Sequence, residues 1–373
     1  MRPGNDFSCK SLPGAYGSIC QRRRNRRMEM KVGIVGCGLI GNKRANAIKG
    51  DHDIVALCDT DIKKAERLKA QRELSNRLNY GKEHTIFVTT DYRELCERDL
   101  DIVIVSTLNA KLSEITLYAV SKNKHVIVEK PASIHSEEIL PILETIRNNK
   151  AKVKVGFNHR YHPALLKAHE IFDSGVCGPV MFIRGRYGHG GRIGYDREWR
   201  ADVSLSGGGE TIDQGVHLID LARWFMGDFD RVDGFAATYY WDMPVDDNGF
   251  IALRKADGRA AWLQVSCTEW KNMFSFEIYC RNAKLQIEGL GGSYGVETLK
   301  VYQMLPEMGP PDTTIYEYPR GDVSWEKEFD EFVCDIVNDR PVHMGDIEDA
   351  YKTLKIVETI YANSDLGRRE AGV

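Results

Sequence analysis

The stretch of sequence that decides the fold is Lys31-Val-Gly-Ile-Val, followed directly by Gly36-Cys37-Gly38-Leu39-Ile40-Gly41. Residues 31–35 predict a buried strand, and residues 39–49 predict a helix. The glycines at the junction follow the pattern GxGxxG. Gly36 allows a tight turn, Gly38 lets a phosphate approach the backbone, and Gly41 lets the helix pack closely on the strand. Because the helix N-terminus adds unpaired N–H groups and about half a positive charge, we expect these six residues to hold a dinucleotide.

An acidic residue, Asp59, follows Gly41 by 18 positions, at the end of the second predicted strand. Its carboxylate would accept hydrogen bonds from the ribose hydroxyls of adenosine. A 2′-phosphate there would meet two carboxylates, Asp59 and Asp61, so we expect NAD rather than NADP. NADP stays open because three cations on the next predicted helix would reduce that repulsion, namely Lys63, Lys64 and Arg67.

Strands and helices alternate through the rest of the first half of the chain. Strands this apolar, such as residues 102–106, are typical of a parallel sheet covered on both faces. After about residue 155 two helices are predicted, at 163–174 and 213–225. They are followed by β-rich segments at 232–240, 249–254, 260–267, 274–279 and 285–288, and by closing helices at 325–337 and 347–362. Neighbouring strands of this kind imply a largely antiparallel sheet.

The predicted fold class is therefore α/β, with two domains. We expect a doubly wound Rossmann domain at residues 30–152, and a C-terminal α/β domain with a large, mostly antiparallel open sheet at 153–373. The length of 373 residues agrees with two domains. No apolar run approaches the roughly 18 residues that a spanning helix needs, so we expect a soluble protein without membrane contact. The nine cysteines include no CxxC spacing, which argues against zinc or a disulfide framework and favours a reducing cytoplasm.

The formal net charge of −3 argues against a nucleic-acid partner, but it is the sum of two segments with opposite net charge. Residues 1–27 carry seven basic side chains and one acid, and the remaining chain has 44 basic and 53 acidic residues, a net charge of −9. We expect residues 1–29 to be a disordered basic tail, or sequence upstream of a start at Met28 or Met30. The alternative is a basic arm that binds nucleic acid or an import receptor.

Glu129-Lys130-Pro131 follows the predicted strand 126–128, and so lies at the carboxyl end of a parallel strand, where doubly wound sheets bind ligands. Pro131 biases Lys130 toward an extended conformation, which would direct the lysine into a cleft. An ordinary surface lysine is the alternative.

A second group of polar residues follows three glycines at 207–209. Asp213 and His217 are four positions apart, so on a helix both side chains project from one face. A carboxylate beside an imidazole sets its orientation and raises its basicity, as a general base acting on an alcohol requires. The glycines would let the backbone pass close to a bulky group. A hydrogen-bonded helix pair is the alternative.

These motifs together resemble the Gfo/Idh/MocA oxidoreductases. The resemblance runs from about Lys31 to the C-terminus, and it also includes residues 156–163 and Trp199-Arg200. It implies a C-terminal open sheet that often forms an oligomer interface, and so a homo-oligomer, dimer or tetramer. It also implies a catalytic set: His217 would take the hydroxyl proton, Lys130 would stabilise developing negative charge, and Asp213 would position its partners.

The resemblance implies further contacts. Thr107 and Asn109 would lie on the nicotinamide side, with Glu129 near the nicotinamide ribose. Lys130 would also contact the cofactor. Leu108 and Leu112 stand where proline and histidine are frequent, which affects the fine cofactor contacts. Substrate contacts are implied for Lys130, Asn158, Arg160, Tyr161, Trp199, Arg200, Asp213 and His217. Because arginine suits phosphate and carboxylate, a phosphorylated or nucleotide sugar stays open.

The predicted function is transfer of hydride between NAD(P) and a secondary alcohol or ketone of a sugar, cyclitol or nucleotide sugar. One alternative is a non-catalytic regulator that senses a dinucleotide or sugar; a weaker one is a dihydrodiol or biliverdin-type reductase. The loop 188–195 could close over the substrate or be a mobile surface loop. His159, His162 and His189 have no matching set of Cys or acidic residues, so we expect no metal.

Overall fold

The computed structural model describes residues 29–365, so the basic segment 1–27 lies outside the described residues. The first half forms a six-stranded sheet in the order β3-β2-β1-β4-β5-β6, with all neighbours parallel. Its strands are β1 (Lys31–Val35), β2 (Asp53–Cys58), β3 (Phe87–Thr89), β4 (Ile102–Val105), β5 (His125–Val128) and β6 (Val153–Val155). This order is that of a doubly wound Rossmann sheet, as the sequence predicts.

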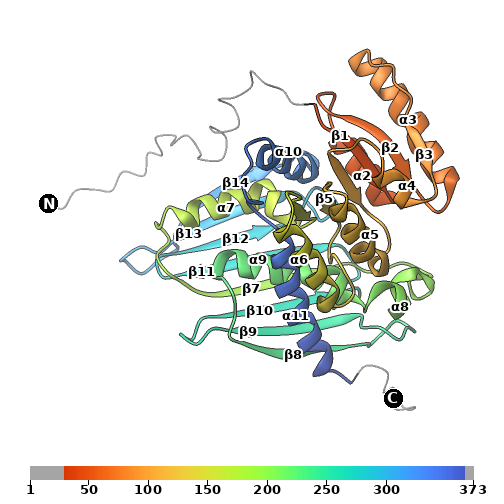
Figure 1. The fold of residues 1–373 in the computed structure, drawn as a ribbon. Helices are drawn as coiled ribbons and strands as arrows, with labels where there is room; N and C mark the ends of the chain where they lie inside the picture. Colours follow the sequence, from red (N-terminus) through yellow and green to blue (C-terminus); the bar gives the residue numbers. More distant parts are fainter. Residues whose placement is uncertain (1–28, 366–373) are drawn as a thin grey trace.

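Helices connect these strands and cover the sheet (Figure 1). They are α2 (Leu39–Ala47), α3 (Ile62–Tyr80), α4 (Tyr92–Cys96), α5 (Asn109–Ser121), the 3₁₀ turn η1 (Ser136–Ile139) and α6 (Leu140–Arg147). Every residue of β4 is buried, which explains its continuous apolar run. The last strand of this sheet, β6, follows residue 152, the last residue of the first domain that the sequence analysis expects.

The second half forms an eight-stranded sheet in the order β14-β13-β12-β11-β7-β10-β9-β8. Its neighbours are antiparallel except β7 and β10, which run parallel. Its strands are β7 (Val180–Gly188), β8 (Arg231–Ala237), β9 (Asn248–Arg254), β10 (Ala260–Ser266), β11 (Met273–Cys280), β12 (Ala283–Glu288), β13 (Glu297–Gln303) and β14 (Asp312–Tyr318). The mostly antiparallel sheet is the predicted one.

Three helices lie over one face of this sheet: α7 (Pro163–Asp173), α9 (Val216–Met226) and α11 (Ile347–Ala362). Side chains along these strands therefore alternate between the face that the helices bury and the exposed face. In β10, Leu263 is buried toward the helices while Trp262 is exposed on the other face. Short elements complete the region between the sheets. They are the 3₁₀ turns η2 (Asn158–Tyr161), η3 (Tyr195–Arg197) and η4 (Trp199–Ala201), α8 (Val203–Ser206) and the π-helical turn η5 (Thr211–Gly215).

The sequence analysis missed β7, β13 and β14. The central strand β7 begins with the apolar residues 180–183, but Arg184 and Arg186 then interrupt the apolar pattern. Its outward Arg184 instead donates to Glu277 on the neighbouring β11 at 2.5 Å. In β14 most residues are exposed, which leaves little hydrophobic signal.

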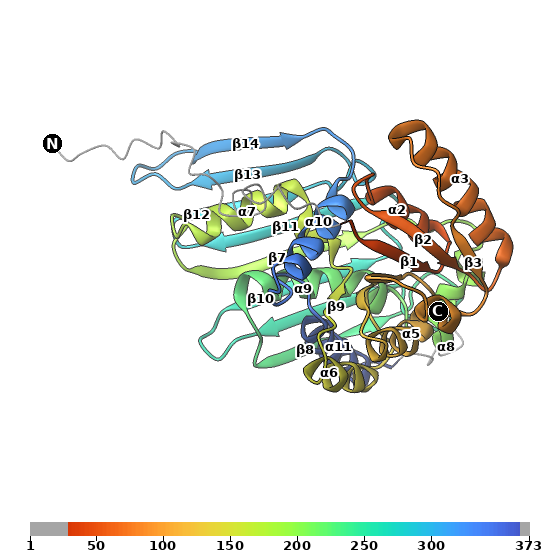
Figure 2. The same ribbon diagram turned by 45° about the horizontal axis from the view of Figure 1, so that its top comes forward.

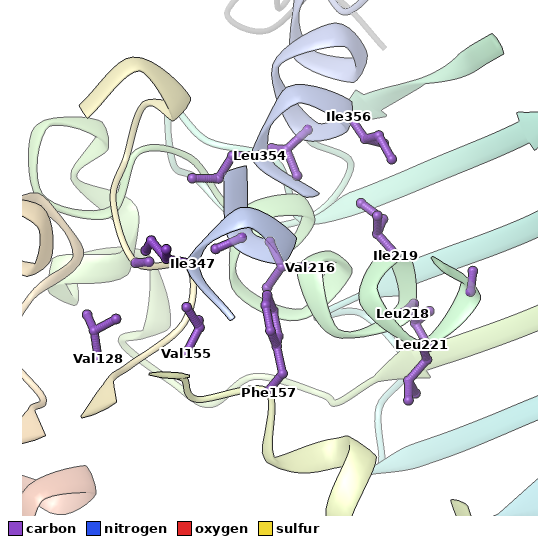
Figure 3. Packing of buried hydrophobic residues seen from close by; sticks show 14 of the residues in the cluster. Val128, Val155, Phe157, Val216, Leu218, Ile219, Leu221, Ile347, Leu354 and Ile356 are labelled. Carbon is purple, nitrogen blue, oxygen red and sulfur yellow. The ribbon is translucent and has the colours of Figure 1, made fainter. Parts of the chain in front are cut away.

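The two sheets share buried side chains, which hold the domains together. Figure 3 shows Val128 and Val155 of the parallel sheet in one cluster with Val216 of α9 and Leu354 of α11. Helix α10 (Ser324–Val337) follows β14 but packs on the Rossmann domain, where Phe329 joins the core around Val32. The junction between the two domains is therefore closely packed. Within residues 29–365, every helix is too short or too polar to cross a membrane.

Candidate active site

The glycine turn at the start of α2 leaves little room for any other residue. Gly36 has φ +94°, and a Cβ there would lie 2.4 Å from the Ser106 carbonyl oxygen. A Cβ on Gly41 would lie 1.9 Å from the Gly36 carbonyl oxygen, because the helix packs directly on the strand. Gly38, in contrast, faces open space and caps α2 without any side-chain hydrogen bond. The start of α2 thus offers the open space and the unpaired backbone N–H groups that a pyrophosphate needs at a helix N-terminus.

Asp59 lies directly after β2 and braces this turn. One carboxylate oxygen accepts from the Cys37 N–H at 2.8 Å, and the other accepts from the Asp61 N–H at 2.9 Å. Asp61 caps α3 by accepting from the Lys63 N–H at 3.1 Å. The free helix terminus, the open Gly38 and the nearby carboxylate fit a bound dinucleotide with unmodified ribose hydroxyls.

A cavity of about 260 Å³ opens between the two domains, beside the glycine turn. The cofactor side of its wall includes Ile40, Lys43, Ser106, Thr107, Asn109 and Glu129. The far wall comes from the second domain and includes Asn158, His159, Tyr187, Trp199, Arg200, Asp213, His217 and Tyr294. Lys130 lies between the two walls. The structure thus brings together Lys130, Asp213 and His217, which the sequence analysis singled out.

Lys130 and Asp213 form an ion pair across the domain boundary. The Lys130 Nζ donates to an Asp213 carboxylate oxygen, and also to the Asp213 carbonyl oxygen at 2.7 Å. The second carboxylate oxygen accepts from Arg200 Nε at 3.0 Å. Burial would raise the pKa of Asp213, but the charges of Lys130 and Arg200 bring it well below its usual range. Asp213 is therefore a fixed anion that holds two cations at the cavity.

His217 is arranged differently from our expectation that Asp213 orients its ring and raises its basicity. Both Asp213 oxygens are bonded to cations, and His217 Nδ1 has no hydrogen-bond partner among the described residues. The ring stacks instead on His159, with centroids 3.7 Å apart. Burial, followed by the charge of Lys130, lowers the pKa of His217 well below its usual value, which outweighs the opposite effect of Asp213. His217 is therefore neutral at pH 7.

The backbone that carries Asp213 is held by a buried carboxylate, Asp246. It accepts from the N–H groups of Gly209 at 2.8 Å and Thr211 at 2.7 Å, and from the Tyr361 hydroxyl at 2.8 Å. A Cβ on Gly209 would lie 1.8 Å from the Asp246 carbonyl oxygen, so the glycines are needed for this close approach. The following turn is π-helical and not a plain α-helical start, a feature often found at functional sites.

Two predicted substrate contacts lie outside the cavity lining. The buried Arg160 donates from Nε to Asp220 at 2.7 Å and from Nη2 to Asp349 at 3.0 Å, so it joins α9 to α11. The Tyr161 hydroxyl donates to Glu331. Asn158 does line the cavity and donates to the Ser324 hydroxyl at 2.9 Å, while Glu129 lines it and accepts from the buried Arg44 at 2.6 Å.

Sequence reasoning missed several residues of this wall. Tyr187 comes from the unpredicted strand β7, and Tyr294 comes from the loop before the unpredicted β13. The sequence analysis weighs His159 only as a metal ligand, although its position inside the motif 156–163 is a usable signal.

Comparison with known proteins supports the fold and the family. The family model described as "Oxidoreductase family, NAD-binding Rossmann fold" matches residues 30–157, and the "GFO/IDH/MocA C-terminal domain" matches residues 165–286. Levoglucosan dehydrogenase of Pseudarthrobacter phenanthrenivorans is 29% identical over 46% of this chain and 44% of that protein. An inositol 2-dehydrogenase of Salmonella typhimurium is 27% identical over 54% of this chain and 56% of that protein. The chain thus matches these curated relatives over about half of their length.

A longer match joins this chain to the D-glucoside 3-dehydrogenase of Escherichia coli, with 23% identity over 91% of this chain and 97% of that protein. Among solved structures, a levoglucosan dehydrogenase in complex with NADH superposes with a TM-score of 0.77 and 20% identity, over 89% of this chain and 96% of that one. GenD2 from gentamicin A biosynthesis, in complex with NAD, gives a TM-score of 0.73 with 21% identity, over 90% and 95%. With its NAD-binding Rossmann domain and its matching C-terminal domain, the chain belongs to the Gfo/Idh/MocA family of oxidoreductases.

Proposed function

We propose that this protein is an NAD-dependent dehydrogenase that oxidises a secondary alcohol of a sugar or cyclitol, or reduces the matching ketone. The observation that carries the proposal is the convergence of Lys130, Asp213 and His217 on one cavity, beside the glycine turn of the Rossmann domain. The relatives named as sugar and inositol dehydrogenases support the substrate class.

Each of the three residues has a separate task. Bound NAD would supply the hydride acceptor, and the protein would supply alignment and proton transfer. The neutral His217 is suited to accept the hydroxyl proton, because its lowered pKa keeps the ring unprotonated at pH 7. Lys130 is suited to donate a hydrogen bond to the same oxygen and to stabilise its developing charge. Asp213 holds Lys130 and Arg200 in place.

The test is the NAD reduction rate on a panel of hexoses, cyclitols and nucleotide sugars, for the wild type, Lys130→Met and His217→Ala. We expect about 10²- to 10⁴-fold slower turnover in each variant, the range typical of general acid–base groups. Lys122→Met is the matched control, because Lys122 pairs with Glu97 on the surface. Undiminished turnover of both site variants would contradict the catalytic assignment. NADH binding by the wild type without turnover of any compound would favour a regulatory role.

We also propose that the protein forms a homo-oligomer through the open face of the eight-stranded sheet. Large side chains gather there on neighbouring strands: Phe182 stacks on Tyr279 with centroids 4.2 Å apart, and Trp262 is 58% exposed. Exposed aromatic side chains of this kind are typical of association surfaces, and here they lie beside ion pairs such as Arg184–Glu277. Light scattering is expected to give a dimer or tetramer, and Trp262→Glu is expected to reduce the mass to that of one chain.

A reducing, cytoplasmic setting is proposed as well. All seven cysteines within residues 29–365 are buried, and none of these forms a disulfide. Disulfides persist mainly in oxidising compartments. Thiol titration of protein purified without reductant and then denatured is expected to detect every cysteine of the chain.

A further inference from the structure

Helix α2 carries a lysine, Lys43, that the proposed hydride transfer does not use. Lys43 follows Ile40 by three positions, so the two side chains lie on one face of the helix, and both line the cavity between the domains. Side chains of an α-helix tilt toward its N-terminus. The Lys43 side chain is therefore directed back along α2, toward the glycine turn 36–41.

The Lys43 ammonium lies over an aromatic ring of α10. Its Nζ is 5.5 Å from the centre of the Trp325 ring, within the range of a cation–π contact. Trp325 lines the same cavity, and its indole N–H donates to Asp322 at 2.9 Å, which fixes the ring. Lys43 is thus exposed to the cavity but has a defined position.

Lys43 differs from the other lysine and arginine side chains that line the cavity. These are Lys130 and Arg200, and both bind the Asp213 carboxylate. Lys43 forms no ion pair with a carboxylate within residues 29–365. Its positive charge is therefore available to a ligand.

The neighbouring arginine, Arg44, is not available in this way. It is 1% exposed and lies against the same Trp325 ring, at 4.4 Å from the centroid. Its Nε donates to Glu129 at 2.6 Å, and its Nη1 pairs with Glu328. Two buried carboxylates thus neutralise Arg44, and Lys43 is the cation of this helix that can bind an anion in the cavity.

A pyrophosphate is an anion whose charge Lys43 can balance. Each phosphate of a dinucleotide carries one negative charge, whereas the N-terminus of α2 contributes only about half a positive charge. The Asp59 carboxylate adds a negative charge beside the same turn, where it accepts from the Cys37 N–H at 2.8 Å. The glycine turn alone therefore leaves much of the phosphate charge uncompensated. A lysine ammonium binds phosphate as a point charge and needs no fixed geometry.

We propose that Lys43 binds the pyrophosphate of NAD: its ammonium donates to a phosphate oxygen, and the Trp325 indole holds the side chain in place. Lys43 is then a cofactor-binding residue, and Trp325 is its positioning residue. The inference goes beyond the proposed function, because it concerns the binding of NAD and not the reaction or the substrate.

The experiment is a calorimetric titration of the wild type, Lys43→Met and Lys43→Arg with three ligands. NADH and ADP-ribose contain the pyrophosphate, and adenosine does not. In Lys43→Met the affinity for NADH and for ADP-ribose is expected to fall about 10- to 100-fold, the usual effect of losing a hydrogen bond to a charged group. The affinity for adenosine is expected to stay within about threefold of the wild type. Lys43→Arg keeps the charge and is expected to restore NADH binding to within about threefold.

Salt dependence and a second variant test the charge and its positioning. Raising the salt concentration from about 50 to about 300 mM is expected to weaken NADH binding more in the wild type than in Lys43→Met, because salt screens the ion pair. Trp325→Leu is expected to lower NADH affinity about two- to fivefold through the lost cation–π contact. Added to Lys43→Met, the same change is expected to have little further effect, because the two residues act as a pair.

Lys49→Met is the matched control. Lys49 pairs with Glu326 of α10 at 3.3 Å, at the same junction between α2 and α10, but it does not line the cavity. Its loss is expected to leave NADH affinity within about twofold of the wild type. Equal losses in Lys49→Met and Lys43→Met would mean a general effect of positive charge and would overturn the inference.

Further outcomes separate this inference from the proposed function. Unchanged NADH affinity in Lys43→Met would overturn the inference while dehydrogenase activity stands. A higher KM for phosphorylated or nucleotide sugars, with unchanged NADH affinity, would also overturn it and would assign Lys43 to a substrate anion. If the wild type oxidises no compound but Lys43→Met still loses affinity for NADH and ADP-ribose, the inference stands and the proposed function does not.

Discussion

The imidazole rings of His159 and His217 stack with their centroids 3.7 Å apart and an angle of 19° between their planes. Neither ring is exposed beyond 5%, and one nitrogen of each, His159 Nε2 and His217 Nδ1, has no hydrogen-bond partner among the described residues. Burial lowers the pKa of both rings well below the usual value of histidine. Two neutral imidazoles therefore lie together in the cavity that Lys130 also lines.

The first prediction concerns the pH dependence of activity. A general base must be unprotonated, and the pKa of His217 is lowered by burial and by Lys130. The acidic limb of kcat/KM is therefore expected well below pH 6.5, with a plateau from about pH 6.5 to 8. Rates of NAD reduction measured from pH 4.5 to 9 test this. Circular dichroism at each pH separates loss of rate from unfolding, and a limb centred at or above pH 6.5 would contradict the role of His217.

The second prediction concerns stability. The unfolded chain protonates His159 and His217 near pH 6.5, whereas the folded chain keeps them neutral to lower pH. The unfolded state thus binds more protons below pH 6.5, so the free energy of unfolding falls as the pH is lowered. Each histidine is expected to contribute a loss of about 1.4 kcal/mol per pH unit. Urea unfolding at pH 5.5, 6.5 and 7.5 measures this, and His159→Phe is expected to show a shallower decline than the wild type.

The third prediction concerns the buried Arg44, which joins the two domains. Its Nε donates to Glu129 at 2.6 Å, and its Nη1 pairs with Glu328 of α10. Arg44→Met would leave two buried carboxylates without their cation and is expected to lower the free energy of unfolding by about 3–5 kcal/mol. Lys49→Met is the control, because Lys49 pairs with Glu326 across the same junction but at the surface. Its expected loss is below about 1 kcal/mol, and similar losses in both variants would refute the argument.

The fourth prediction concerns cofactor choice. Asp59 lies after β2, where its carboxylate accepts a hydrogen bond from the Cys37 N–H. The same carboxylate would repel a 2′-phosphate. Asp59→Ser is expected to weaken NADH binding by about tenfold or more and to reduce the preference for NADH over NADPH. Fluorescence titration with both nucleotides gives the ratio. Asp91→Ala, which removes a cap from α4 instead, is expected to keep the wild-type ratio, and an unchanged ratio in Asp59→Ser would exclude Asp59 as its origin.

Local steric demands and hydrophobic periodicity made much of the fold predictable. Gly36 and Gly41 are required by contacts within one strand–turn–helix unit, so the sequence alone indicates the Rossmann sheet. The apolar run of β4 is sufficient to predict that the whole strand is buried. In β7 the apolar residues 180–183 are followed by two arginines, and the pairing of Arg184 with Glu277 becomes visible only once the neighbouring strand is placed.

The sequence by itself determined the Rossmann unit, the α/β class and the residue types of the site, because these depend on contacts between near neighbours in the chain. Only the tertiary structure decided which of two similar arginines reaches the cavity. Arg160 is neutralised by Asp220 and Asp349, whereas Arg200 binds Asp213 at the cavity wall. Likewise, only packing buries the Glu210 carboxylate, which accepts from the Tyr195 hydroxyl at 2.7 Å. A side chain's partners come from segments far along the chain, so its charge and solvation are set by the assembled fold and not by local sequence.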